Sequence, residues 1–159
     1  MSVHKDVKAN AKQLEVLFWS IALPGFGQLL NRKYLKALLF VALEFIVNVK
    51  GKINAIIMYS FLGEMDKAVA SADYLWVMFY PCLYLFAIWD AYRDAGEQVQ
   101  PFTFLPFVFA AYLGTIGVIY SPILTIQGLL IGPVFLPIIG MISGVFVGLL
   151  LKKILRTYR

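Results

Sequence analysis

This sequence is poor in the residues that most enzymes use. Its 159 residues include one cysteine and one histidine, and only 14% of them are charged. Cys82 has no partner for an intramolecular disulfide or a cysteine metal cluster. His4 lies in a polar N-terminal segment, which excludes a Ser-His-Asp or histidine-rich metal site within the apolar stretches. No phosphate-binding glycine loop, dinucleotide fingerprint or HExxH motif occurs, so we expect no enzyme and no cofactor.

Apolar residues, in contrast, are abundant and clustered. They make up 61% of the chain, and the mean hydropathy is +0.79. Soluble domains usually contain about 45–50% apolar residues. A chain of this length and composition cannot cover itself with a polar surface. It is therefore predicted to be a single all-α integral membrane domain over residues 1–159.

Four apolar stretches are predicted to cross the bilayer, which takes about 20 helical residues. The first has only 16 residues. The last has 29 residues and contains Gly132-Pro133 and Pro137, which predict a kink or a break before the true span. The four stretches are 34–49, 74–89, 102–120 and 123–151.

The apolar stretch 14–30 is interrupted by Pro24, Gly25 and Gly27, and its uninterrupted part, 16–23, has only 8 residues. It is either a distorted full span or a re-entrant hairpin that enters the bilayer and returns. With a re-entrant hairpin, both termini lie on the same side of the membrane, together with 11 of the 14 basic residues. With a full span, only 8 basic residues lie on the side of the C-terminus. The positive-inside rule therefore favours the hairpin, with both termini in the cytoplasm.

Two connecting regions are also informative. Segment 53–62 is apolar but too short to span, and a polar acidic segment follows it, which predicts an interfacial helix among the lipid headgroups. Only Ser121-Pro122 separates the last two spans, so residues 102–151 should form a tight helical hairpin. The basic residues flank the spans instead of forming a stripe with exposed aromatics, which indicates membrane lipids as partners and excludes nucleic acid.

Segment 24–37 reads Pro-Gly-Phe-Gly-Gln-Leu-Leu-Asn-Arg-Lys-Tyr-Leu-Lys-Ala. It resembles the turn of TM2-type and TM2-like small bacterial membrane proteins, in which a Pro-Gly-x-Gly-Gln turn joins an apolar half to a second hydrophobic helix. Segment 86–95 is similar to the aromatic and acidic end of such a unit. The resemblance covers residues 14–95. Asn31-Arg32-Lys33 replaces the usual glycine-containing turn, and residues 102–159 have no counterpart. The resemblance implies a membrane scaffold and no enzyme.

The turn residues themselves have two interpretations. Pro24, Gly25, Gly27 and Gln28 can form a turn that needs a flexible φ and close packing, or they can contact a ligand directly. We favour the packing role.

Glu44 is the most unusual residue of the predicted spans. An ionisable group in the hydrocarbon region costs about 2.5–3.5 kcal/mol or more, so it should face a partner or a cavity. Asn48 lies four residues later and therefore on the same helical face. Either the pair forms a proton or cation site, or Glu44 forms a hydrogen bond that holds its helix to a neighbouring helix. We favour the hydrogen bond between helices.

Asp90, Arg93 and Asp94 share one helical face where the second span should leave the membrane. An interfacial ion cluster that holds the helix end is the favoured interpretation. A metal or phosphate site is the alternative, but no histidine or glycine loop accompanies the two carboxylates.

Gly140, Gly144 and Gly148 repeat at intervals of four in the last span. Such a row lets two helix backbones approach closely. Packing within the chain and self-association between chains are both compatible with it.

These features favour a non-catalytic scaffold or accessory subunit of the cytoplasmic membrane. Its partners would be lipids and either a second copy of the chain or another membrane protein. The alternative is a small-molecule or ion transporter or channel that uses Glu44. It would act as an oligomer, because four thin helices barely enclose a pore. The absence of a second ionisable residue deep in another span argues against a proton relay.

Overall fold

The computed structural model describes residues 2–96 and 100–157, with side chains from residue 10 onward. The predicted all-α class is confirmed, with one small antiparallel sheet added. The helices are α1 (Ser2–Ala22), α2 (Phe26–Leu30), α3 (Tyr34–Gly51), α4 (Ile53–Phe61), α5 (Met65–Ser71), α6 (Tyr74–Val77), α7 (Tyr80–Ala95), α8 (Leu105–Tyr120) and α9 (Gly132–Thr157), and the strands are β1 (Thr125–Ile126) and β2 (Leu129–Leu130).

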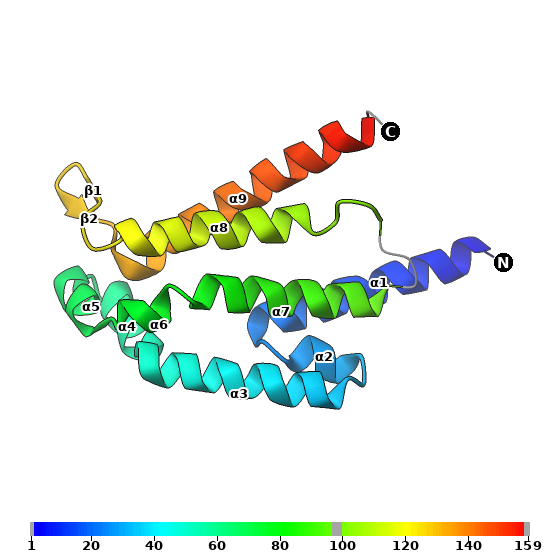
Figure 1. The fold of residues 1–159 in the computed structure, drawn as a ribbon, viewed down its shortest axis with the longest axis horizontal. Coiled ribbons are helices and arrows are strands. Elements are labelled where there is room, and N and C mark those ends of the chain that lie inside the picture. Colours follow the sequence, from blue (N-terminus) through cyan, green and yellow to red (C-terminus); the bar gives the residue numbers. More distant parts are fainter. Residues whose placement is uncertain (1, 97–99, 158–159) are drawn as a thin grey trace.

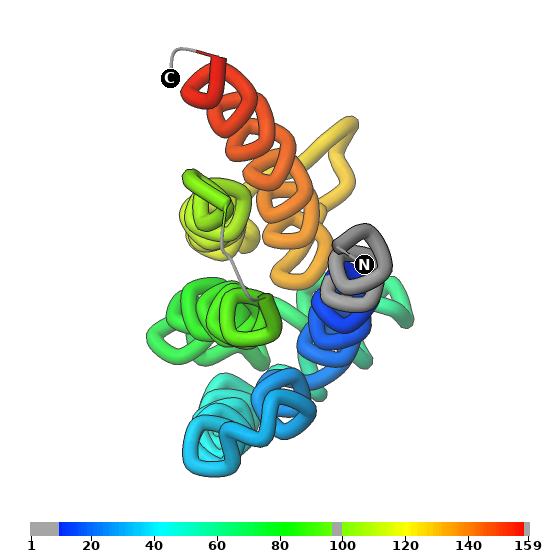
Figure 2. The backbone as a smooth tube through the Cα atoms, turned by 90° about the vertical axis from the view of Figure 1, so that its right-hand side faces the viewer, coloured from blue at the N-terminus to red at the C-terminus, as the bar shows by residue number. Residues whose placement is uncertain are grey.

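The central element is α7, which lies between α3 on one side and α8 on the other, with α9 packed outside α8 (Figure 1). Figure 2, seen along the helices, places α1 and α2 beside α7 and α3. The short helices α4 to α6 and the β-hairpin gather at one end of the molecule, whereas α1 begins and α9 ends at the other. The long helices therefore run side by side between two opposite ends.

The N-terminal region forms a helical hairpin. Figure 1 shows α1 ending part-way along α7, after which the chain returns through α2 toward the end at which α1 begins. The break lies at Pro24 and Gly25, and Gly25 has a φ of 98°, which a residue with a side chain rarely adopts. The interruption that the sequence predicts in 14–30 is therefore a reversal of the chain and not a bend within one helix.

Among the described residues, two stretches are long and apolar enough to cross a membrane: Tyr74–Ala95 with 22 residues, which comprises α6 and α7, and Gly132–Thr157 with 26 residues, which is α9. The prediction of four spans is therefore supported only in part. At 16 residues, α8 reaches about 24 Å at 1.5 Å per residue, whereas the hydrocarbon layer is about 30 Å thick. The 18-residue helix α3 contains Lys36, Glu44 and Lys50, and these charges oppose its insertion.

A β-hairpin separates α8 from α9, where the sequence predicts a tight helical hairpin and an apolar run from Ile123. The strands β1 and β2 pair antiparallel. Gln127 and Gly128, which connect them, have φ values of 53° and 80°, as a two-residue turn of the I′ type requires. Helix α9 begins only at Gly132 and continues through Pro137. The expected break before the last span is thus a hairpin.

The segment predicted to be one interfacial helix forms α4, and a second short helix, α5, follows it. Ile56 of α4 and Ala68 of α5 are buried together with Val77 of α6 and Val118 of α8. Both α4 and α5 also contact α9. These short helices therefore close one end of the bundle and hold its two halves together there.

The helices α8 and α9 pack with their backbones in contact along the glycine row. A Cβ atom on Gly144 would collide with the carbonyl oxygen of Phe109 and the backbone of Ala110, and Gly140 and Gly148 are equally close to the backbone of α8. No side chain can therefore be added to the row without separating the helices. The glycine row therefore packs against a helix of the same chain, which is the first of the two alternatives.

We expect Gly144→Leu to lower the free energy of unfolding by about 1–3 kcal/mol, because the new side chain must push two touching backbones apart. Thermal unfolding in detergent, followed by circular dichroism, measures the change. Ser143→Leu is the control, since Ser143 is exposed, and it should stay within about 0.5 kcal/mol of wild type. Equal melting of the wild type and Gly144→Leu would contradict close packing at this row.

Candidate functional site

The turn between α1 and α2 is shaped by the close approach of α3. A Cβ atom on Gly25 would lie 2.6 Å from Cγ2 of Val41 and 2.9 Å from the carbonyl oxygen of Ala37. Gly27 is equally restricted, because a Cβ there would lie 2.7 Å from the Cβ of Ala91 on α7. Both glycines thus allow α2 to fit between α3 and α7. They pack against helices of the same chain, as the favoured interpretation of the turn expects.

Gln28 connects this turn to α7. Its side chain is fully buried, and its Nε2 donates to the carbonyl oxygen of Ala87 over 2.8 Å and to Oδ2 of Asp90 over 3.3 Å. Asn31 makes a similar contact, since its Nδ2 donates to the carbonyl oxygen of Ala91 over 2.8 Å. The last turns of α7 thus receive two side-chain amides from the α2 region.

The predicted charge cluster at the end of α7 exists, and it includes a residue that sequence reasoning missed. Nζ of Lys36 lies 2.8 Å from Oδ1 of Asp90 and 2.7 Å from Oδ2 of Asp94. Arg93 also pairs with Asp90 over 2.9 Å, and its guanidinium group lies 4.6 Å from the ring centroid of Trp89. Two cations therefore neutralise two carboxylates.

This neutral cluster leaves little room for a metal or phosphate. The described residues contain no group of three or more histidine, cysteine, aspartate or glutamate side chains that could hold a metal ion. Both carboxylates of the cluster already bind a cation of the chain itself. The arrangement joins α3 to α7, as expected for the interfacial ion cluster.

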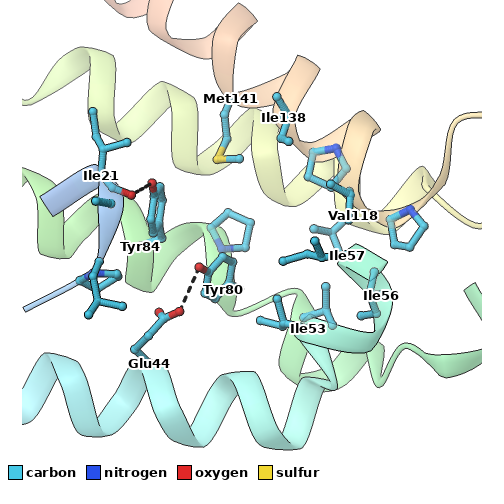
Figure 3. Close-up of a pocket in the computed structure, with 18 residues that line it drawn as sticks. Ile21, Glu44, Ile53, Ile56, Ile57, Tyr80, Tyr84, Val118, Ile138 and Met141 are labelled. Carbon is cyan, nitrogen blue, oxygen red and sulfur yellow. Dashed lines mark hydrogen bonds between the residues drawn. The ribbon is translucent and has the colours of Figure 1, made fainter. Parts of the chain in front are cut away.

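Glu44 projects from α3 toward α7, where Tyr80 meets it (Figure 3). The side chain is 9% exposed, and the hydroxyl group of Tyr80 donates to its Oε1 over 3.1 Å. Its other carboxylate oxygen, Oε2, is buried and has no hydrogen-bond partner among the described residues. One half of this carboxylate therefore ties α3 to α7, and the other half is unused.

Glu44 is also one of the residues that line a cavity of about 280 Å³. Its walls are mainly isoleucine, valine and proline side chains, with Glu44, Tyr80 and Tyr84 as the polar lining residues (Figure 3). Tyr84 donates its hydroxyl proton to the carbonyl oxygen of Ile21 over 2.6 Å, which satisfies one of the last carbonyl groups of α1. Glu44 is thus the only acidic group among the residues that line this cavity.

Asn48 does not join Glu44 in one polar site. Its Nδ2 donates to Oδ1 of Asn54 on α4 over 3.3 Å. Both Glu44 and Asn48 line a second cavity of about 260 Å³. They lie on the same helical face, but among the described residues Glu44 is hydrogen-bonded to Tyr80 and Asn48 to Asn54, and not to each other. The sequence spacing thus predicted the face correctly without predicting the partners.

Sequence reasoning missed Lys36, Tyr80 and Tyr84. The sequence treats Lys36 only as one of the basic residues that flank the spans, and nothing in it singles out the two tyrosines. The available signal was chemical pairing: an acidic pair at one span end needs cations, and a buried carboxylate needs a donor. Pairing alone does not say which of many candidates lies close, because the partners are 36 or more residues apart in the chain.

Comparison of the chain with protein-family models, with curated proteins and with solved structures found no match. No homologous protein therefore bears on the function. The TM2-like resemblance stays a prediction carried by its motif residues, and the function has to be argued from the geometry alone.

We expect Lys36→Met to lower the free energy of unfolding by about 1–2 kcal/mol, because Asp90 and Asp94 would lose the cation that they share. Lys33→Met is the matched control. Lys33 is exposed and makes only backbone contacts in the structure, so its change should stay within about 0.5 kcal/mol. Chemical unfolding in mixed micelles compares the two variants, and equal stabilities would show that the ion pairs of Lys36 contribute nothing to the free energy of unfolding.

Proposed function

We propose that this chain is a non-catalytic, multi-pass protein of the cytoplasmic membrane that acts as a scaffold or accessory subunit. The apolar exterior of its longest helix supports membrane insertion. Ile142, Phe146 and Leu150 of α9 are 53%, 69% and 60% exposed. In the most apolar 18-residue segment of α9, only 17% of the residues are buried. Exposing such a surface to water would cost about 25 cal/mol per Å², whereas lipid removes that cost.

The observation that carries the scaffold function is that the polar motif residues bind other groups of the chain. Gln28 and Asn31 donate to backbone carbonyls of α7, and Lys36 pairs with Asp90 and Asp94. Oε1 of Gln28 and Oδ1 of Asn31 have no partner among the described residues, but neither residue lines the two cavities at Glu44, where a ligand-binding motif would present its unpaired groups. The TM2-like turn is therefore best explained as a structural element that holds neighbouring helices together.

In the membrane, we propose that α7 and α9 cross the bilayer and that α3 and α8 run beside them as shorter crossing helices, which makes four spans. The charged cluster of Lys36, Asp90 and Asp94 would lie at the cytoplasmic interface, and the hairpin of α1 and α2 would re-enter from the same side. Short helices α4 and α5 would lie at the outer interface. Lipids and either a second copy or another membrane protein would be the partners.

Cysteine labelling tests this orientation. In a Cys82→Ser background, Ala11→Cys and Thr157→Cys should both resist an impermeant maleimide in intact cells, because 11 of the 14 basic residues favour the cytoplasm on that side. Lys52→Cys should be labelled. Permeabilised cells provide the control, since all three variants should then react. Labelling of Ala11→Cys together with protection of Thr157→Cys would mean that the first apolar stretch crosses fully.

Transport is the second candidate, and one observation favours it. Glu44 lines a cavity, and its Oε2 is buried without a hydrogen-bond partner among the described residues. Intramembrane carboxylates of this kind are common in ion and substrate pathways. A transporter built from such thin helices would require an oligomer.

Two substitutions of Glu44 separate these functions. In a scaffold, Glu44→Gln should melt like the wild type, because the amide oxygen still accepts the hydrogen bond from Tyr80. Glu44→Leu should lose about 1 kcal/mol, because Tyr80 then lacks an acceptor. Wild-type proteoliposomes should also dissipate an imposed pH gradient no faster than protein-free liposomes. Gradient loss that disappears in Glu44→Gln, with melting unchanged, would replace the scaffold by a transporter.

A further inference from the structure

The cavity beside Glu44 has the features of a site for a molecule with one positive charge. We propose that it binds an organic monocation, an apolar body that carries a single amine or quaternary ammonium group, with this group against the carboxylate of Glu44. The proposal concerns binding alone. It applies to a scaffold as well as to a transporter, and it rests on neither function.

The first argument is the missing counter-charge. A buried carboxylate is costly unless a cation or enough hydrogen-bond donors accompany it, and Glu44 has one donor, Tyr80. Lys36 on the same helix is eight residues away, about 12 Å along the axis, and already pairs with Asp90 and Asp94. None of the residues that line the cavity is basic. Any positive charge beside Glu44 would therefore have to come from a bound molecule, because the residues that line the cavity supply none.

The second argument is the chemistry of the walls. Tyr80 and Tyr84 stack with ring centroids 5.6 Å apart, and both line the cavity. Electron-rich rings beside a carboxylate attract organic cations, and apolar surfaces such as those of Ile53, Ile57 and Ile138 accommodate the body of the ligand. An inorganic divalent cation fits poorly, because it would need about six oxygen ligands. An anion would be repelled by Glu44.

The third argument is access. Glu44 also lines the second cavity, whose other walls include Phe45 and Val49. These two side chains are 69% and 57% exposed on the outer face of α3. A molecule that partitions into lipid along this face can therefore reach the carboxylate between α3 and its neighbours. Apolar amines partition in this way, whereas hydrated metal ions do not.

A matched ligand pair tests the proposal. Benzyltrimethylammonium and neopentylbenzene have the same shape, but the first has a charged nitrogen where the second has a carbon. Isothermal titration of the full chain in a non-ionic detergent should detect binding of the cation and about tenfold weaker or no binding of the neutral molecule. Thermal shift measurements with the same two ligands give a second readout that does not depend on the heat of binding.

Variants then test whether the carboxylate of Glu44 is the charge that attracts the cation. Glu44→Gln should bind the cation about tenfold more weakly and approach the affinity of the neutral molecule. Tyr80→Phe keeps the carboxylate and the ring, so it should keep the preference for the cation. Glu64→Gln, an identical change at an exposed carboxylate outside the cavity, should bind like the wild type.

Three outcomes would overturn the inference. Equal affinity of the wild type for the two ligands would mean that the cavity takes apolar molecules without regard to charge. Absence of binding for both would mean that it takes neither. Cation binding that persists in a folded Glu44→Gln variant, as judged by circular dichroism, would place the site elsewhere. If this variant does not fold, the comparison of ligands on the wild type still decides.

Discussion

The arrangement of the other helices depends on the attachment of the α2 region to the end of α7. Gln28 and Asn31 bind backbone carbonyls there, and Lys36 spans the carboxylates of Asp90 and Asp94. These contacts are directional, whereas the apolar contacts between α3 and α7 around Val47 and Leu83 specify position less strictly. Gln28 and Asp90 are buried, so hydrogen bonds to groups of the chain take the place of hydrogen bonds to water. The position of α3, and with it that of Glu44, follows from this attachment.

Much of the fold could be predicted because its signals are local. Pro24 and Gly25 predicted the break after α1, and the glycine row predicted a close helix contact of α9, although the sequence left open whether the chain reverses and which helix the row meets. The β-hairpin was missed because Gln127-Gly128 lies inside an apolar run whose length indicates a membrane span. Only two of the four predicted spans meet the length and apolarity of a crossing helix in the structure, because the sequence count did not weigh the three charges of α3 or the 16-residue length of α8.

The candidate site was predictable to a lesser extent. Glu44 could be singled out because a buried carboxylate is costly wherever it lies. Its donor, Tyr80, could not, because nothing local distinguishes this tyrosine from the eight others in the chain. The same limit applies to Lys36, which looks like any flanking cation until α7 lies beside it. Burial cost identifies which residue needs a partner, but only the packing of distant segments identifies the partner itself.

The two halves of the molecule also differ in the order in which they can assemble. The contact between α8 and α9 joins neighbours in the sequence, so it can form as soon as α9 has been synthesised. The side chain of Gln28 has to wait for a carbonyl 59 residues further along the chain. Throughout that interval the buried amide and the charge of Lys36 lack their final partners. Folding of this chain therefore includes an interval before α7 is in place, during which these polar groups depend on water or on another molecule for their hydrogen bonds.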